Sequence, residues 1–404
     1  MKRSALLFSA LLVGAASVAN AQGLTMQMSN GWSFSFAGNV NAFIIYGQNK
    51  GSATVDGGLI GTDDKATRIR AGLLPAAATF EARGKEGNTD LGVHFGFFPQ
   101  IQCTAPAHDC FGAQIDMRQV FLTVGGKWGQ ILAGRELGLF NRQNILTDQA
   151  LFGAGPQAFT LNGGGTGGTT LGRIGLGYIY PNFNAQMTYS TPGGRPGQLS
   201  IGLFDPSGLA GGGPISYGVT KAPRVEVEGT YTLSSVKLWA SGTINNASTA
   251  ASGGTSKTAT GVGGGFKWSG SGFALVGSGY YGKGIGTTFQ FNDVGGGTIS
   301  KAVDNVGELR KSFGYIGQLN YTPSGGKVTL SGSYGDSRVK QSADDKATSN
   351  GTLVKSNSAI IGTVVYQATK SLKVVWEYDH AEAKNHAGQK NKQDQGAFGL
   401  MVFF

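Results

Sequence analysis

The sequence predicts an all-β protein, a 16-stranded antiparallel transmembrane β-barrel, and three observations lead to this prediction. First, apolar residues recur with a period of two along almost the whole chain, as in strands that have two unlike faces. Second, charged residues make up 14% of the chain and glycine contributes 69 of 404 residues. Such a composition is unusual for soluble domains and unfavourable for helices. Third, short breaks in the pattern alternate with long polar ones.

Residues 1–21 have the pattern of a secretory signal peptide. Lys2 and Arg3 form its basic start, an apolar stretch follows, and Ala19-Asn20-Ala21 matches a cleavage site. Loss of this segment would lower the formal charge from +10 to +8 and leave residues 22–404 as the barrel domain. Beyond it, no apolar run approaches the ~18 residues of a helical membrane span. We therefore expect the exported chain to cross a membrane as strands.

The first and last predicted strands have one apolar face each. WSFSFAGNVNAFIIY, residues 32–46, places large apolar side chains on one face and Ser33, Ser35, Asn39 and Asn41 on the other. The final GAFGLMVFF, residues 396–404, alternates Phe398, Leu400, Val402 and Phe404 with mostly small residues. Lipid would solvate such a face, and pairing of the two strands would close the barrel without leaving an edge.

The breaks between strands give the predicted strand count. Seven short breaks lie within 84–88, 125–129, 181–183, 232–235, 269–272, 323–327 and 368–371. Eight long ones lie at about 47–70, 101–116, 136–171, 192–222, 246–259, 283–312, 337–356 and 382–394. Short periplasmic turns and long extracellular loops are typical of outer-membrane barrels, and these breaks separate sixteen strands. Within 192–222, GQLSIGLFD either extends the seventh strand or folds within the loop.

The strand phase assigns charged side chains to the barrel interior. The basic residues predicted to face inward are Arg83, Lys85, Arg173, Arg224, Lys237, Lys267 and Lys373, and the acidic ones are Glu81, Glu226, Glu228, Glu377 and Asp379. The excess of basic residues favours a weak to moderate anion preference. Alternatively, these charges pair across neighbouring strands and leave the interior nearly unselective. Arg118 and Arg135 fall in phase with apolar neighbours, so each lies at the headgroup rim or is turned inward by a bulge.

Other chemistry is poorly represented in the sequence. Cys103 and Cys110 flank a loop-like stretch, and in an exported protein they predict a local disulfide. The four histidines have no ligand spacing, and no nucleophile elbow or P-loop is present, so we expect no metal, no cofactor and no enzyme activity. The basic residues are dispersed, which argues against nucleic acid as a partner.

Three places in the chain resemble the general porins of Gram-negative outer membranes, especially the porin-4-type family. They are the first strand after the signal, QVFLTVGGKWGQILAGRELGLFNRQNILTD at 119–148, and the aromatic C-terminus. The resemblance implies that Gly134-Arg135 ends the fifth strand, with Arg135 directed inward, and that the third loop, 136–171, folds into the pore. It also implies a homotrimer and recognition of Phe404 by the outer-membrane assembly machinery.

The third loop departs from the pattern of enteric porins, because it lacks their acidic P-E-F-G element. Its own Glu136, Arg142 and Asp148 are therefore the candidate charges of the constriction. Together with Arg83, Lys85, Arg135, Arg173, Arg224 and Lys373 they form the predicted pore lining.

The sequence thus predicts a passive, water-filled outer-membrane channel for small hydrophilic or anionic solutes. Its expected partners are outer-membrane lipid, lipopolysaccharide and further copies of the chain. The alternative is a barrel whose long loops act in adhesion or in enzymatic work at the cell surface. The loops are rich in glycine, serine and threonine and lack clustered catalytic groups, which argues against this alternative.

Overall fold

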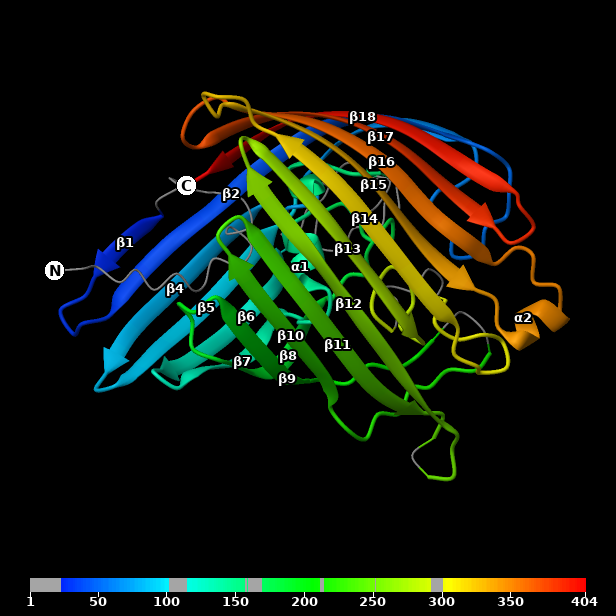
Figure 1. Cartoon of the computed structure of the whole chain (residues 1–404), viewed down its shortest axis with the longest axis horizontal. Coiled ribbons are helices and arrows are strands. Elements are labelled where there is room, and N and C mark those ends of the chain that lie inside the picture. Colours follow the sequence, from blue (N-terminus) through cyan, green and yellow to red (C-terminus); the bar gives the residue numbers. More distant parts are fainter. Residues whose placement is uncertain are drawn as a thin grey trace.

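The computed structural model describes residues 23–101, 115–156, 158, 169–210, 214–250, 252–291 and 301–404 as one closed antiparallel β-barrel (Figure 1). Its strands are β1 (Leu24–Gln27), β2 (Ser33–Lys50), β3 (Asp64–Arg70), β4 (Ala77–Glu86), β5 (Thr89–Pro99), β6 (Ile115–Gly126), β7 (Gly129–Leu137), β8 (Phe183–Ser190), β9 (Gly197–Phe204), β10 (Arg224–Leu233), β11 (Val236–Ser248), β12 (Ser256–Gly270), β13 (Phe273–Lys283), β14 (Lys311–Tyr321), β15 (Val328–Lys340), β16 (Val354–Gln367), β17 (Leu372–Asn385) and β18 (Lys390–Phe403). The helical segments are α1 (Arg142–Leu146), α2 (Ala343–Ala347) and the 3-10 turn η1 (Gln149–Phe152). None of the described helices is long and apolar enough to cross a membrane.

The barrel has sixteen wall positions, as predicted. β3 and β4 pair with different halves of β2 and together fill one position, while β1 pairs with the start of β2. The wall closes between β2 and β18, where Val402 pairs with Val40, and Phe404 exchanges backbone hydrogen bonds with Gly38. Closure satisfies the backbone groups that an open edge would leave bare in hydrocarbon.

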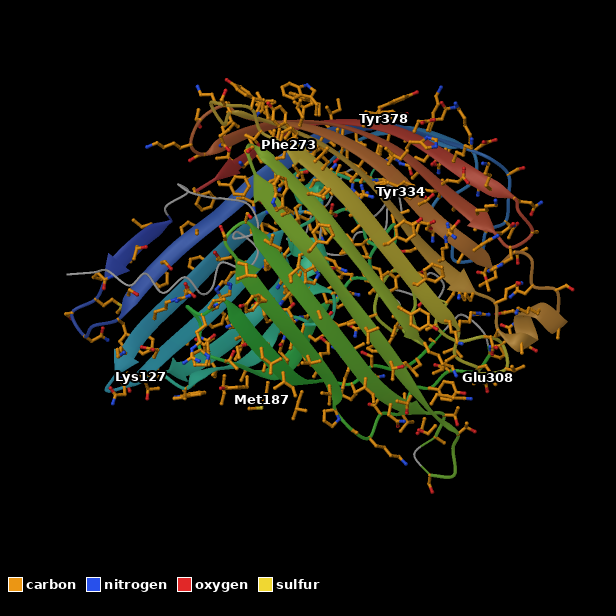
Figure 2. All side chains as sticks on the ribbon, in the orientation of Figure 1. Lys127, Met187, Phe273, Glu308, Tyr334 and Tyr378 are labelled. Carbon is orange, nitrogen blue, oxygen red and sulfur yellow. The ribbon has the colours of Figure 1, made fainter. Side chains whose placement is uncertain are left out.

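The two faces of the wall differ as the alternation predicts. In the last strand Phe398, Leu400 and Val402 are 40–48% exposed on the outside, whereas Ala397 and Met401 on the opposite face are buried. Figure 2 shows Met187, Phe273, Tyr334 and Tyr378 projecting from the outer surface in the same way. The apolar C-terminal segment is therefore an ordinary wall strand with lipid as its solvent.

The predicted order of strands is wrong at one place. Residues 172–180, expected to form a wall strand before a turn at 181–183, lie inside the barrel and are almost entirely buried. The missing wall strand is β9, which lies within the predicted loop 192–222 and pairs with β8 and β10. The two errors cancel, so the count of sixteen holds while the third loop extends to residue 182 instead of 171.

We call residues 138–182 the inner loop, because this segment connects β7 to β8 and its described residues, 138–156, 158 and 169–182, lie inside the barrel. Their apolar side chains pack against wall residues and the loop after β3, forming one buried cluster: Leu73, Leu137, Ile145, Leu146, Ala150, Leu151, Leu171, Ile174, Tyr178, Phe289 and Ile361. A cluster of this size fixes the inner loop across the lumen.

Candidate pore constriction and vestibule

The first part of the inner loop is held against β10, β11 and β12. Glu226 Oε2 accepts hydrogen bonds from the backbone N–H groups of Leu139 and Phe140 at 2.7 and 2.9 Å. One turn further, Arg142 forms an ion pair with Glu228, and both side chains are largely buried. These wall carboxylates therefore bind the inner loop and do not face the channel.

Glycine in β12 allows α1 to approach the wall so closely. A Cβ atom on Gly263 would overlap Asn141 Oδ1, and one on Gly261 would lie 2.8 Å from the Phe140 ring. Both glycines are in phase with Lys267 on the lumen face of the strand. The glycine-rich stretch of β12 thus serves packing against the inner loop.

The middle of the inner loop is fixed by Glu377 on β17. Its Oε1 accepts the backbone N–H groups of Ala154 and Gly155 at 2.9 and 2.7 Å. A Cβ atom on Gly153 would overlap Glu377 Oε2, so the close approach depends on glycine there. We call this contact the Glu377 latch.

The last part of the inner loop carries a buried ion pair. Arg173 Nε lies 3.7 Å from Asp148 Oδ1, and Tyr178 donates a 2.9 Å hydrogen bond to Asp148 Oδ2. Arg173 also donates to the Ala359 carbonyl and to the Ser333 hydroxyl of the wall. Burial raises the pKa of Asp148 and lowers the pKa of Arg173, and their mutual attraction opposes both shifts. Both residues were predicted to line the pore, but they lie within the packed interior and attach the inner loop to β15 and β16.

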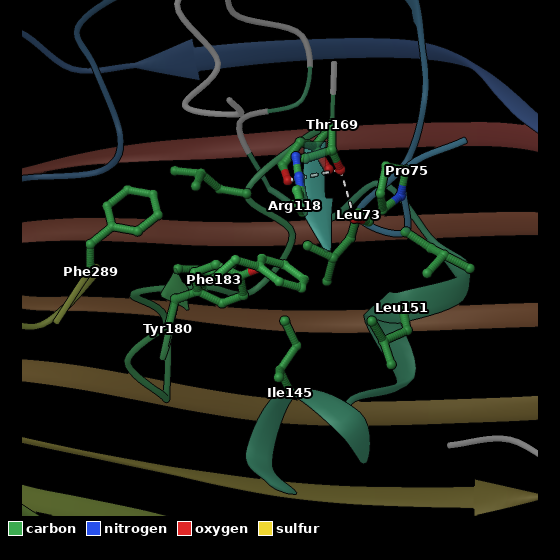
Figure 3. A pocket seen from close by; sticks show the side chains of 13 residues that line it. Leu73, Pro75, Arg118, Ile145, Leu151, Thr169, Tyr180, Phe183 and Phe289 are labelled. Atoms are coloured by element: carbon green, nitrogen blue, oxygen red, sulfur yellow. Dashed lines mark hydrogen bonds between the residues drawn. The ribbon is translucent and has the colours of Figure 1, made fainter. Parts of the chain in front are cut away.

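A small, mostly apolar cavity lies beside the inner loop (Figure 3). Arg118 is the charged residue among those that line it, and its guanidinium lies 5.6 and 5.8 Å from the ring centroids of Phe98 and Phe183. Arg118 also forms a 2.7 Å ion pair with Asp116. A break in register between Gly96 and Phe98 of β5 places an extra residue in β6, and this bulge turns Arg118 inward.

The inward orientation predicted for Arg135 is wrong. β7 pairs regularly with both neighbours through this position, and Arg135 is exposed on the same face as Ile131. The adjacent Glu136 does face inward, where it is buried and accepts a hydrogen bond from Gln119 at 2.8 Å. A bulge was one alternative for both arginines, and of the two only Arg118 has one.

A wide cavity of about 670 Å³ opens at the turn end of the barrel, below η1. We call it the vestibule. Its polar wall includes Gln318, Asn320 and Thr363, and Phe152 of the inner loop forms part of its roof, with the Lys373 ammonium 5.2 Å from the ring centroid. Four lysines line it: Lys267, Lys327, Lys370 and Lys373.

The other predicted lining residues do not meet at one site. Arg83 and Lys85 lie near the turn end of β4, paired with Glu81 at 2.8 Å and Asp90 at 3.2 Å. Arg224 is 1% exposed, with Glu226 at 3.0 Å and the Phe204 and Phe291 rings at 5.1 and 5.6 Å. Cys103 and Cys110 lie outside the described residues, so their disulfide stays a prediction.

Two vestibule lysines were missed because they lie in turns. Lys327 and Lys370 belong to the predicted short breaks PSGGK and ATKS, which strand phase does not orient. A count of charges in the turns would have found them, since turns at the barrel end border the channel mouth.

A closed barrel with outward apolar side chains, crossed by an inner loop above a cationic vestibule, defines a membrane channel. The family model of the Gram-negative porins matches residues 9–387, and the chain belongs to this family. It is an outer-membrane porin.

Solved structures agree in fold at low sequence identity. The outer-membrane channel DcaP of Acinetobacter baumannii has a TM-score of 0.69 at 13% identity, over 94% of this chain and 99% of that chain. An anion-selective porin from Comamonas acidovorans gives 0.61 at 14%, over 92% and 100%. The trimer form of OmpT, an outer membrane protein of Vibrio cholerae, gives 0.56 at 11%, over 93% and 100%. No curated protein matches this chain in sequence.

Proposed function

We propose that this porin is a diffusion channel for small hydrophilic solutes with a preference for anions. The observation that carries the proposal is the vestibule, where four lysines lie around one cavity. Selectivity in a channel follows the charges that line the path of the ion. Positive potential in a water-filled cavity with low-dielectric walls concentrates anions and excludes cations.

The acidic residues of the interior do not offset these lysines. Five carboxylates predicted to face inward or to lie in the inner loop are at most 5% exposed: Asp148, Glu226, Glu228, Glu377 and Asp379. Each is bound to a backbone N–H group, an arginine or an amide, as Asp379 is to Gln395 at 2.8 Å. Buried and paired charges contribute little to the potential in the vestibule, so the lysines dominate it.

The constriction is assigned to the inner loop in the same proposal. Its contacts reach from β10 and β11 through β14, β15, β16 and β17, so it borders the channel along more than one wall. The comparison with an anion-selective porin supports the anion preference, and the trimer form of OmpT supports a homotrimer. One channel in each subunit belongs to the same proposal. Export by a cleaved signal peptide at 1–21 belongs to the same proposal.

The family and the fold indicate a channel and not an enzyme. The test is therefore electrical. In planar bilayers, the variant K267Q/K327Q/K370Q/K373Q should lose most of the wild-type chloride-over-potassium permeability ratio while its conductance persists. A matched control, K50Q/K65Q/K355Q/K392Q, removes four exposed lysines away from the vestibule and should leave the ratio near the wild-type value. Equal ratios in the wild type and the vestibule variant would reject the lysines as the selectivity determinant.

A further inference from the structure

The vestibule has an apolar surface beside its cationic one. Phe152 and Val365 are half-buried: each packs against a buried cluster of the wall, and the surface that it leaves exposed borders the vestibule. The rings of Phe152 and Phe403 meet edge to face, with their centroids 6.3 Å apart. Leu146 and Leu151, from α1 and η1, line the same cavity. We call these five residues the apolar patch.

Three of the four vestibule lysines meet around Gln367 on β16. The backbone N–H of Gln367 donates to the Lys327 carbonyl at 2.7 Å, and its side-chain amide donates to the Lys370 carbonyl at 3.5 Å. The Lys373 ammonium donates to Gln367 Oε1. We call Lys327, Lys370 and Lys373 the lysine group. The fourth lysine, Lys267, lies on β12, several strands away.

The lysine group and the apolar patch adjoin each other. The Lys373 ammonium lies 5.2 Å from the centroid of the Phe152 ring. Val365 lies two residues before Gln367 on the same strand, so the two side chains are on the same face of the wall. One charged region and one apolar region therefore share a border inside a single cavity.

No carboxylate of the protein neutralises the lysine group. Within the described residues, no acidic side chain forms an ion pair with any of its three members. Asp148 is the acidic residue among those that line the vestibule, and its carboxylate is buried against Arg173 and Tyr178. Like charges around one residue repel each other, and an anion in the vestibule would relieve this repulsion.

From this arrangement we propose that the vestibule binds organic monocarboxylates with an apolar body, and that Phe152 determines this specificity. The inference rests on the proposed function, because it names the class of anion that the vestibule favours. The carboxylate lies among the lysine group, and the apolar body covers the Phe152 ring. This contact removes apolar surface from water, which an inorganic anion cannot do. An anion with charges at both ends would place one of them against the apolar patch, at a cost in desolvation.

The test is the block of chloride current by benzoate in planar bilayers, with the anion added to both sides of single channels. Acetate is the matched ligand, because it has the same charge and no ring. Benzoate should halve the current at a concentration about tenfold below that of acetate, since burial of an aromatic ring contributes about this much to affinity. Equal half-blocking concentrations of the two anions would overturn the inference.

Variants assign the effect to the two regions. Phe152→Ser should bring the two half-blocking concentrations within about threefold of each other, because the ring is lost. Phe152→Leu keeps an apolar side chain and should restore most of the difference. K327Q/K370Q/K373Q should weaken the block by both anions together. An unchanged difference in Phe152→Ser would overturn the role of Phe152, and so would a loss of the difference in Phe152→Leu. The heat-modified gel mobility of each variant reports folding.

The proposed function and this inference fail in different ways. A zero-current potential of the sign set by potassium would reject the anion preference, whatever the block by benzoate. A potential of the sign set by chloride, together with equal block by benzoate and acetate, would reject this inference alone.

Discussion

The carboxylate of Glu377 fixes the middle of the inner loop. It accepts two adjacent backbone N–H groups at 2.9 and 2.7 Å, and the loop reaches it because Gly153 has no Cβ atom. Two hydrogen bonds from adjacent backbone groups to one carboxyl oxygen fix both the position and the orientation of the loop at this point. The Glu377 latch therefore holds the segment that separates the vestibule from the rest of the interior.

Loss of the latch should loosen the constriction. We expect Glu377→Ala to raise single-channel conductance and open-channel noise, because Ala154 and Gly155 lose their shared acceptor. Glu377→Gln keeps a carbonyl oxygen at the same place and should stay close to the wild type. Recordings in planar bilayers measure both. If the alanine and glutamine variants conduct alike, the latch does not set the width of the channel.

Gly153→Ala tests the same contact from the side of the loop. The added Cβ atom would overlap the carboxylate, so the expected result is again a higher conductance. Gly362→Ala is the matched control, since a Cβ atom at that wall position meets nothing within 4 Å. An equal change in both variants would trace the effect to glycine replacement in general.

At the loop end, Asp345 attaches α2 to the barrel. Burial alone would raise the pKa of Asp345, but hydrogen bonds from Arg310, Ser342 and Asn350 hold this pKa well below its ordinary value. Because the folded pKa lies below the unfolded one, its stabilising contribution is fully present above about pH 4 and is lost at lower pH. We expect hydrogen exchange of the α2 amides, corrected for intrinsic rates, to be equally slow at pH 7 and pH 5.

Asp345→Asn should accelerate that exchange at both pH values, because the bidentate ion pair with Arg310 is lost. The neighbouring Asp344→Asn is the control and should have a smaller effect, limited to the charge at the helix start. Faster exchange in the wild type at pH 5 than at pH 7 would contradict this account of α2.

Arg118 and Arg135 show what the alternation of single residues can and cannot predict. Both are in phase with apolar neighbours, and the sequence pattern gives them identical alternatives. The structure separates them through one extra residue in β6, opposite Gly96 and Phe98. A bulge depends on pairing with a distant strand, so the local pattern does not contain this information.

Among the strands, β9 and the buried segment 172–180 exchange their predicted roles. Ile174, Leu176 and Tyr178 alternate with glycine and arginine in the way that Leu199, Ile201 and Leu203 alternate in β9. The period of two reports a one-sided apolar segment in both cases. It does not say whether the apolar side faces lipid or the barrel interior, because either environment removes these side chains from water. The other fifteen of the sixteen wall positions were predictable because each of them lies between clear turns.

Because β9 is a wall strand, a charged side chain should destabilise the protein on the lipid face of β9 but not on its lumen face. Ile201 is 48% exposed on the outer face, so Ile201→Arg should lower the free energy of unfolding in vesicles by about 2–4 kcal/mol. Gln198 faces the lumen in the same strand, and Gln198→Arg should stay within about 0.5 kcal/mol of the wild type. Urea titration of the protein in lipid vesicles measures both. A small effect of Ile201→Arg would place this strand away from lipid.

For the whole molecule, the distribution of charge follows from how the interior is filled. The inner loop brings backbone N–H groups, arginines and amides against the acidic side chains of the wall, and it leaves the lysines at the turn end facing the vestibule. The inward charges predicted from strand phase have a modest basic excess. Packing makes that excess larger, because it buries four of the five acidic residues predicted to face inward but only two of the seven basic ones, Arg173 and Arg224.

The zero-current potential of the wild-type porin under a potassium chloride gradient reports whether the vestibule lysines or the buried acids govern the path of the ion. We expect a potential of the sign set by chloride, from channels that insert in groups of three. A potential near zero, or one of the sign set by potassium, would contradict it, since the buried acids would then still govern the path of the ion.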